Sequence, residues 1–376
     1  MPICVAVPKE IFPGERRVAL VPGVAGALSK QGLQVLLEAG AGAAAFYHDN
    51  EYSTARIVHD RTALFTEADI VLTVHPLTPE VIGQLRDGTT VIGFLHPHEY
   101  PERTALLRDR KITSFAMELV PRLSRAQGMD ALSSQASIAG YKAALMAANR
   151  TARFFPMLTT AAGTIRPAKV LVIGVGVAGL QAIATAKRLG AMVEAYDVRP
   201  ETREQVESLG AKFVDVQVAA EGSGGYAREL TEEEKQREME ILGQHVAQAD
   251  AIISTAGVPG KPAPRIITES MVDQMKHGSV IIDLAAYSGG NCELTQPGDT
   301  IGHERVMIYG PLNVPAMLPV HASEMYAKNL ANFLSLIVHD GELKPDWDDE
   351  VVSASALTVA GEIRHEQTRE FVETQT

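Results

Sequence analysis

The sequence predicts an α/β protein with two domains, each a doubly wound sheet of mostly parallel strands. Short β-rich runs alternate with helix-like stretches along most of the chain, and this alternation is typical of parallel sheets with helices on both faces. The length of 376 residues is enough for two domains of ordinary size.

In the first domain, the strand-like and helix-like runs are bounded by proline or glycine. The expected strands are residues 3–7, 35–37, 68–74 and 90–95. The expected helices are residues 23–31 and 102–110. Residues 129–149 are rich in Ala, Ser and Leu and contain no proline, so they predict one long helix that leads into the second domain.

The second domain contains a further series of strand–helix units. Its expected strands are residues 169–173, 192–196, 212–216, 251–254, 279–283 and 307–309, and its first helix is residues 180–189. A helix-like run at 322–336 should return the chain to the first domain, against which the acidic tail at 344–376 should partly pack. The expected domains are therefore residues 1–133 with 312–376, and residues 134–311.

A polar, glycine-containing segment at 221–240 is long for a connection inside a compact α/β domain. Connections of this length are usually functional lids or disordered. Because Gly222, Gly224 and Gly225 cluster next to Tyr226, we expect a loop that is mobile without ligand and ordered with it.

Composition excludes several classes of protein. The net charge of -12 argues against nucleic acid, because neutralising phosphates needs an excess of Lys and Arg, and also against direct docking on an anionic membrane. No apolar run approaches the roughly 18 residues of a membrane helix, and no signal peptide is recognisable. Cys4 and Cys292 match no metal-ligand spacing, so we expect no metal and a reduced, cytoplasmic setting.

A glycine-rich motif directly follows the strand at 169–173 and directly opens a helix, as dinucleotide binding requires. Gly174 permits the tight turn, Gly176 lets the backbone approach a pyrophosphate, and Gly179 allows close packing of helix and strand. The helix N-terminus offers free N–H groups and a positive dipole end to the phosphates. The motif predicts a Rossmann-like, NAD-binding domain; the alternative is a structural glycine turn without a ligand.

An acidic residue, Asp197, lies about 20 residues beyond the motif, at the end of the next strand. There it would accept hydrogen bonds from the adenosine ribose hydroxyls and repel a 2′-phosphate, which favours NAD(H) over NADP(H). The neighbouring Arg199 weakens this preference. The other expected cofactor-binding residues are Val177, Ala178, Val198, Thr255, Ala256 and Gly257.

The chain also resembles a known family. The segments that carry the resemblance are residues 121–148, 174–191, 256–272, 278–293, 347–352 and 360–363. They are similar to domain I, the NAD(H)-binding component, of proton-translocating NAD(P)+ transhydrogenase, within the alanine dehydrogenase/transhydrogenase superfamily. The segment 121–148, which we call the Arg-Gln-Asp segment after Arg122, Gln127 and Asp130, and the GGNCE run at 289–293 are much more specific than the glycine motif.

The resemblance implies hydride transfer from NADH to NADP+ held on a separate domain or subunit, with a membrane component that couples the transfer to proton movement. It also implies a homodimer that is peripheral on the inner face of the plasma membrane through its partners, and an NAD-binding cleft between the two domains. Because hydride passes directly between two nicotinamides, the site must supply orientation and no general acid or base.

Carried over by motif, four residues would hold the nicotinamide ring and its ribose: Arg122, Gln127, Asp130 and Ser133. Tyr226 would lie on the mobile loop that closes over bound nucleotide. Other interpretations remain open for these residues, because Arg122 and Asp130 would also suit a surface ion pair and Ser133 a helix start.

Two other functions remain open. In an alanine dehydrogenase-like enzyme, Arg17 and His96 match the substrate-binding arginine and catalytic histidine, whereas His75 stands in place of a lysine and Tyr287 in place of an aspartate. The Arg-Gln-Asp segment also replaces the dehydrogenase's own sequence, so transhydrogenase is favoured. The third hypothesis is an NAD-sensing module without redox chemistry.

Overall fold

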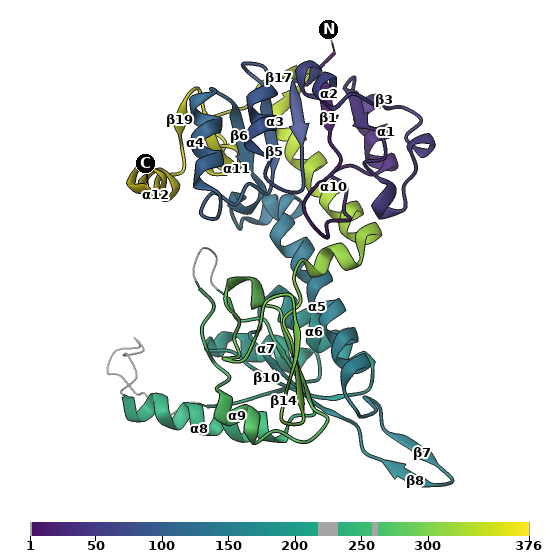
Figure 1. Cartoon of the computed structure of the whole chain (residues 1–376), viewed down its shortest axis with the longest axis vertical. Helices are drawn as coiled ribbons and strands as arrows, with labels where there is room; N and C mark the ends of the chain where they lie inside the picture. Colours follow the sequence, from purple (N-terminus) through teal and green to yellow (C-terminus); the bar gives the residue numbers. More distant parts are fainter. Residues whose placement is uncertain (1, 217–231, 258–261, 376) are drawn as a thin grey trace. The chain divides into compact units, whose positions relative to one another are not determined.

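The computed structural model in Figure 1 describes residues 2–216, 232–257 and 262–375. The chain divides into two compact units, which we call the first unit (Met1–Gln135 with Pro315–Thr376) and the second unit (Ala136–Val314). The expected domain boundaries fall within a few residues of these. No helix among the described residues has the length and apolar character needed to cross a membrane.

The first unit contains a sheet in which six parallel strands follow the doubly wound order, β3-β2-β1-β4-β5-β6. The parallel strands are β1 (Cys4–Val7), β2 (Gln34–Glu38), β3 (Arg56–Val58), β4 (Ile70–Leu72), β5 (Thr90–Gly93) and β6 (Thr113–Ala116). Beyond β6 the sheet continues with two antiparallel strands, β18 (Ala356–Val359) and β19 (Glu362–Ile363). The expected packing of the tail against this unit is confirmed.

Helices cover both faces of this sheet. They are α1 (Pro22–Lys30), α2 (Arg61–Glu67), α3 (Pro79–Gln84), α4 (Pro101–Asp109), α10 (Pro319–Ile337), α11 (Glu350–Ser355) and α12 (Glu366–Gln375). Val5 and Val7 of β1 pack in one apolar cluster with Leu330 of α10, while Ala6 packs in a second cluster with Leu64 of α2. Because successive side chains of a strand point to opposite faces, the two clusters show that both faces are buried.

The second unit repeats the same strand order, β11-β10-β9-β12-β13-β15, with β14 antiparallel at the edge. Its strands are β9 (Lys169–Ile173), β10 (Met192–Tyr196), β11 (Lys212–Phe213), β12 (Ala251–Ser254), β13 (Val280–Asp283), β14 (Thr300–His303) and β15 (Val306–Tyr309). Its helices are α6 (Val177–Arg188), α7 (Arg203–Ser208), α8 (Glu232–Gln248) and α9 (Glu269–Asp273). The predicted fold class, two Rossmann-like parallel-sheet domains, is confirmed.

The remaining elements complete the fold. The helix α5 (Ala131–Arg150) contains the boundary between the two units. A hairpin of β7 (Leu158–Thr160) and β8 (Gly163–Ile165) projects from the second unit in Figure 1, and β16 (Val338–His339) pairs with β17 (Glu342–Leu343). Single 3-10 turns occupy Ala43–Ala45, Asp49–Glu51, Met117–Leu119, Ser124–Met129, Pro200–Thr202, Ala286–Ser288 and Val314–Met317.

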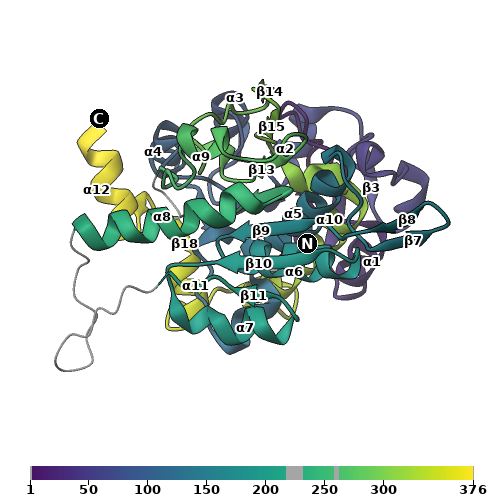
Figure 2. The ribbon, with the colours of Figure 1, turned by 90° about the horizontal axis from the view of Figure 1, so that it is seen from below.

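The prediction of a loop over residues 221–240 is wrong in its second half, because α8 begins at Glu232. The Glu, Lys and Gln residues at the start of this helix have high helix propensity. Leu242 and Val246, four residues apart, lie on one helix face and are buried in the core with Leu171 of β9. Figure 2 shows α8 alongside β9. Tyr226 and the glycines at 222, 224 and 225 lie outside the described residues.

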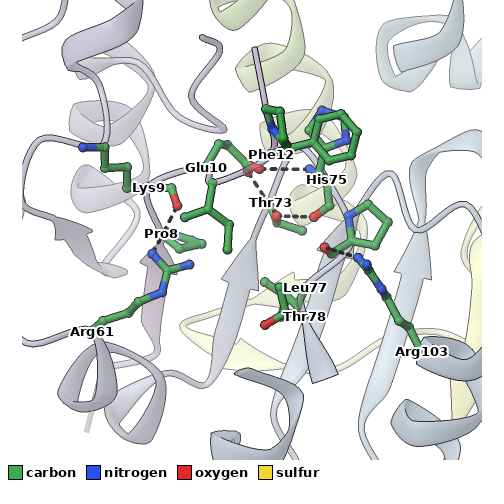
Figure 3. A pocket seen from close by; sticks show the side chains of 13 residues that line it. Pro8, Lys9, Glu10, Phe12, Arg61, Thr73, His75, Leu77, Thr78 and Arg103 are labelled. Atoms are coloured by element: carbon green, nitrogen blue, oxygen red, sulfur yellow. Dashed lines mark hydrogen bonds between the residues drawn. The ribbon is translucent and has the colours of Figure 1, made fainter. Parts of the chain in front are cut away.

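The turn that follows β4 is held by Glu10, which comes shortly after β1 (Figure 3). The Glu10 carboxylate accepts hydrogen bonds from the N–H groups of Val74 (2.6 Å) and His75 (3.3 Å) and from the Thr73 hydroxyl (3.1 Å). Burial raises the pKa of Glu10 to about 7, the hydrogen bonds offset part of that rise, and the negative charge of Glu15 adds to it.

We predict that the stability of Glu10→Gln, relative to that of the wild type, increases with pH. The native pKa of about 7 exceeds the ordinary value of 4.5, so between these values the native state binds more protons than the unfolded state. Wild-type stability therefore falls as pH rises through this window, and the stability of the variant relative to that of the wild type increases by about 2 kcal/mol from about pH 5 to pH 8. Urea unfolding measures the difference, and parallel stability curves would contradict the prediction.

Candidate functional site

In the second unit, the strand order reverses between β9 and β12. In open α/β sheets, ligands bind beyond the carboxyl ends of the strands at this switch point. The glycine motif follows β9, and the segment 255–257 follows β12. Asp197, at the end of β10, lies one strand away. The predicted cofactor-binding residues in the described chain therefore come from three neighbouring strands of one sheet edge.

The glycine turn is too tight for side chains at two of its positions. Gly174 has a φ of 89°, and a Cβ there would lie 2.7 Å from the Ala256 nitrogen. A Cβ at Gly179 would lie 2.0 Å from the Gly174 carbonyl oxygen. At Gly176, by contrast, a Cβ would meet nothing within 4 Å. Packing within the chain therefore requires glycine at 174 and 179, whereas the absence of a side chain at Gly176 leaves the backbone open to close approach.

The helix α6 begins directly at this turn, with Gly176 as its N-cap residue. No side chain caps it, and its first turn, which includes Val177 and Ala178, contains no acidic residue. The backbone N–H groups at a helix start lack partners within the helix and carry a partial positive charge. The N-terminus of α6 is therefore suited to bind phosphate oxygens.

Asp197 is almost fully buried, and its carboxylate is already engaged. It accepts hydrogen bonds from the Val175 N–H (2.6 Å) and from the backbone and guanidinium nitrogens of Arg199 (2.9 to 3.0 Å). Burial alone would raise the pKa of Asp197, but these hydrogen bonds outweigh burial and lower it. The Arg199 side chain, which pairs with this carboxylate, is about half exposed. Val198 is 76% exposed.

Thr255 and Ala256, which follow β12, are fixed by hydrogen bonds. The Thr255 hydroxyl donates to the Gly174 carbonyl oxygen (2.9 Å). The Asn291 amide accepts from the Ala256 N–H (3.0 Å) and donates to the Ala256 (2.8 Å) and Pro264 (2.9 Å) carbonyl oxygens. Gly257 is exposed at the end of this segment.

Asn291 is itself held by Asp283, a fully buried carboxylate at the end of β13. The Asp283 carboxylate accepts hydrogen bonds from the Asn291 N–H (2.8 Å) and the Ser254 (2.9 Å) and Thr295 (2.6 Å) hydroxyls. Neither Asn291 nor Asp283 was among the predicted site residues. The only sequence signal was the GGNCE run, which carried family resemblance but no assigned role.

In the first unit, the four residues predicted to hold the nicotinamide line one cavity. This cavity has a volume of about 390 Å³, and its polar lining includes Arg122, Gln127, Asp130 and Ser133. Arg122 and Gln127 are exposed, whereas Asp130 and Ser133 are partly buried. Among the described residues, no ion pair joins Arg122 to Asp130, so the surface-pair interpretation finds no support there.

The segment that forms this cavity is anchored by other residues. Arg125 makes a bidentate ion pair with Asp349 (2.9 Å to each oxygen). The Gly128 carbonyl oxygen accepts hydrogen bonds from the amides of Asn329 (2.9 Å) and Asn332 (2.8 Å) of α10. These contacts hold the 3-10 turn Ser124–Met129 in place. The polar side chains that line the cavity are not the ones that make them.

Asp130 and Ser133 do share a helix-start role. One Asp130 oxygen accepts from the Ser133 N–H (2.8 Å) and the other from the Ser133 hydroxyl (2.6 Å), at the beginning of α5. This arrangement satisfies a backbone donor that the helix itself leaves unpaired. A hydroxyl that donates in this way can still accept a hydrogen bond from a ligand, and a carboxylate has more acceptor positions than these two bonds use.

The residues considered for an alanine dehydrogenase-like enzyme do not line this cavity. Arg17 is buried and paired with Glu15, whose carboxylate also contacts the His75 imidazole (2.7 Å). His96 has a φ of 44°, and its backbone N–H donates to Glu118 (2.5 Å). Tyr287, in the second unit, is 76% exposed. Within the described chain, no cluster of His, Cys, Asp or Glu side chains is placed to hold a metal ion.

Comparisons with known proteins find similarity over most of the chain. The family models described as "Alanine dehydrogenase/PNT", N-terminal and C-terminal domains, match residues 6–139 and 143–366. A relative from Rhodospirillum rubrum, named as the first portion of NAD(P) transhydrogenase subunit alpha, is 47% identical over 375 residues, which cover 96% of this chain and 97% of the relative.

Two solved structures are also similar. The crystal structure of transhydrogenase from Sinorhizobium meliloti has a TM-score of 0.85 at 41% identity and covers 97% of this chain and 99% of that chain. An L-alanine dehydrogenase has a TM-score of 0.83 at 25% identity, with 100% of each chain covered.

We predict that two substitutions after β10 affect the binding of different nucleotides. Asp197→Asn should weaken NADH binding about tenfold, because hydrogen bonds to a charged acceptor are stronger than those to a neutral one. Arg199→Ala should leave NADH affinity within a few-fold and weaken NADPH binding, because it removes the cation nearest to a 2′-phosphate. Isothermal titration calorimetry with both nucleotides measures these changes. An equal loss of NADH affinity in the two variants would show that Arg199 itself contacts NADH.

Proposed function

The chain belongs to the alanine dehydrogenase/PNT family, and from this premise we propose that it is the NAD(H)-binding component of a proton-translocating transhydrogenase. In this reaction, hydride leaves the nicotinamide of NADH on this chain and joins the nicotinamide of NADP+ on a separate domain or subunit. The predicted resemblance to the transhydrogenase branch is confirmed by the 47% identical relative.

Each set of residues described above would bind one part of NADH. The pyrophosphate lies at the N-terminus of α6, beside Gly176, and the adenosine ribose bonds to Asp197. The nicotinamide and its ribose are held by the cavity residues Arg122, Gln127, Asp130 and Ser133. Tyr226, for which the resemblance implies a place on the mobile loop, lies outside the described residues.

The observation that carries the proposal is the shared cavity of these four polar residues. Direct hydride transfer between two nicotinamides releases no proton at the reacting carbons, so it needs no acid or base. It needs two rings held at about 3 to 3.5 Å. A guanidinium, an amide and a carboxylate can fix the carboxamide and ribose hydroxyls and leave the reacting face of the ring open to a second nucleotide.

Amino-acid oxidation, the alternative function, is less well supported. It needs a cationic group that is available to the substrate carboxylate. Arg17, the arginine that matches this role in sequence, already forms a buried ion pair with Glu15. His75 contacts the same carboxylate.

The partners follow from the same proposal. The chain acts with an NADP(H)-binding subunit and a membrane subunit, which couples the transfer to proton translocation, and it forms a homodimer. It is held at the cytoplasmic face of the plasma membrane through these partners. The relatives' names as subunits support a multi-subunit assembly.

A hydride-transfer assay tests the function. We expect the purified chain, mixed with an NADP-binding domain of a transhydrogenase, to reduce a thio-analogue of NADP+ with NADH, and neither component to do so alone. Alanine-dependent NADH formation by this chain alone would overturn the proposal in favour of a dehydrogenase. Calorimetric NADH binding without either reaction would indicate a binding module.

Within that assay, Arg122→Ala and Asp130→Asn should lower the rate of hydride transfer far more than they weaken NADH binding. Interactions that position the ring contribute most in the transition state. Arg86→Ala is the matched control, because Arg86 forms an exposed ion pair with Asp69 on the same unit. Single-turnover rates and calorimetric affinities separate the two effects, and equal losses in rate and affinity would contradict the prediction.

A further inference from the structure

The side chain of Asn291, which is fully buried, binds the segment after β12 at two points. Its Oδ1 accepts a hydrogen bond from the Ala256 N–H (3.0 Å). Its Nδ2 donates to the carbonyl oxygens of Ala256 (2.8 Å) and Pro264 (2.9 Å). An amide is needed for this pattern of one acceptor and two donors, because a carboxylate has no donor and a hydroxyl has only one.

Asn291 is itself held by backbone hydrogen bonds. Its N–H donates to the buried Asp283 carboxylate (2.8 Å), and its carbonyl oxygen accepts from the N–H groups of Ile266 (2.8 Å) and Ile267 (2.9 Å). The neighbouring Gly290 has a φ of 85°, and a Cβ there would lie 2.8 Å from the Asp283 carboxylate. The edge of the sheet therefore sets the position of Asn291, and Asn291 sets the position of the segment after β12.

The bond to the Ala256 carbonyl oxygen also orients the next N–H group along the chain. This carbonyl and the Gly257 N–H belong to one peptide group, and in a trans peptide the two point in opposite directions. All peptide bonds of the described residues are trans. The Gly257 N–H therefore points away from the buried Asn291. Gly257 is exposed, and a Cβ there would meet nothing within 4 Å.

The order of the strands gives the direction of a bound dinucleotide. In the proposed function, the adenosine ribose bonds to Asp197 at the end of β10, and the pyrophosphate lies at the turn after β9. Since β12 is the next strand on the other side of β9, the second ribose of an extended NADH would reach the segment after β12. This segment touches the glycine turn, because the Thr255 hydroxyl donates to the Gly174 carbonyl oxygen (2.9 Å).

We propose that Asn291 is a positioning residue for NADH. By holding the Ala256 peptide, it directs the Gly257 N–H toward the ribose on the nicotinamide side of the pyrophosphate. A donor that is held in place before the ligand arrives binds more tightly than one that must first be ordered. Asn291 does not contact the nucleotide itself, and its role rests on the proposed function because it takes NADH as the ligand of this site.

Calorimetric titrations with NADH and with ADP test the proposal, because ADP is NADH without the nicotinamide and its ribose. Asn291→Ala should weaken NADH binding about tenfold, the size expected for one lost hydrogen bond, and leave ADP binding unchanged. Asn291→Asp has the same shape but replaces the donating Nδ2 by an acceptor, so it should also weaken NADH binding and leave ADP binding unchanged.

Asp250→Ala is the matched control, from the opposite end of β12. The buried Asp250 carboxylate accepts from the Lys169 N–H (2.8 Å) and binds the Lys276 ammonium (3.0 Å). Its removal leaves buried donors unpaired and should lower the Tm, but both nucleotides should bind as they do to the wild type. An unchanged NADH affinity of Asn291→Ala, or equal losses of NADH and ADP affinity, would overturn the proposal.

Gly257→Val extends the test to the case in which the Asn291 variants do not fold. Gly257 has no positive φ and faces open space, so a side chain there disturbs no packing within the described chain. It should weaken the binding of NADH but not of ADP, and any other result would overturn the proposal. A wild-type chain that binds no NADH would overturn the proposed function as well. The two failures are therefore distinguishable, and neither titration involves hydride transfer.

Discussion

The close approach of the turn after β9 to the chain after β12 is the contact on which the second unit's site depends. A Cβ at Gly174 or Gly179 would collide with backbone atoms, so only glycine permits this close approach at the start of α6. The chain after β12 is fixed by buried hydrogen bonds. Asp283 accepts from the Asn291 N–H, and the Asn291 amide bonds to both the N–H and the carbonyl oxygen of Ala256. The position of the N-terminal end of α6 is therefore set by packing and buried hydrogen bonds at this edge of the sheet.

The two units share one strand order but use their switch points differently. In the second unit, the space beside Gly176 is open and the helix end is uncapped. In the first unit, Glu10 and Glu15 place carboxylates at the end of β4 and beside Arg17, so the donors that a ligand would need are satisfied by the chain. A separate polar cavity of this unit lies at the 3-10 turn before α5. The same strand order thus leaves the space beside Gly176 open in one unit, and in the other it places carboxylates that satisfy nearby donors.

Local sequence patterns were sufficient to predict much of this architecture. The runs that became β9 and β12 are short, apolar and buried on both faces, and the glycine turn has a steric reason at each of two positions. The strands β18 and β19 escaped prediction because their place at the edge beside β6 depends on a partner more than 200 residues away. The start of α8 was predicted to be loop because its first turns are polar, although Leu242 and Val246 carried a helical spacing.

For the candidate site, motifs identified the side chains that line the cavity but not those that support them. Arg125 lies in the same segment as Arg122, yet its partner Asp349 is distant in the sequence, so only the structure assigns it to anchoring. The pairing of Arg17 with Glu15 was equally invisible, because two residues of opposite charge near a turn are common on protein surfaces. Burial distinguishes this pair from a surface ion pair, and the sequence does not reveal which side chains are buried.

The first unit is discontinuous, and this has a consequence for how the chain reaches its native state during synthesis. Its core includes Phe333 of α10, and its sheet is extended by β18, both of which follow the second unit in the sequence. The second unit is contiguous and can fold as soon as residue 314 has emerged, whereas the first 135 residues must wait with an incomplete core. The N-terminal region of the nascent chain is thus the later to mature, and it is the region for which a chaperone would matter most.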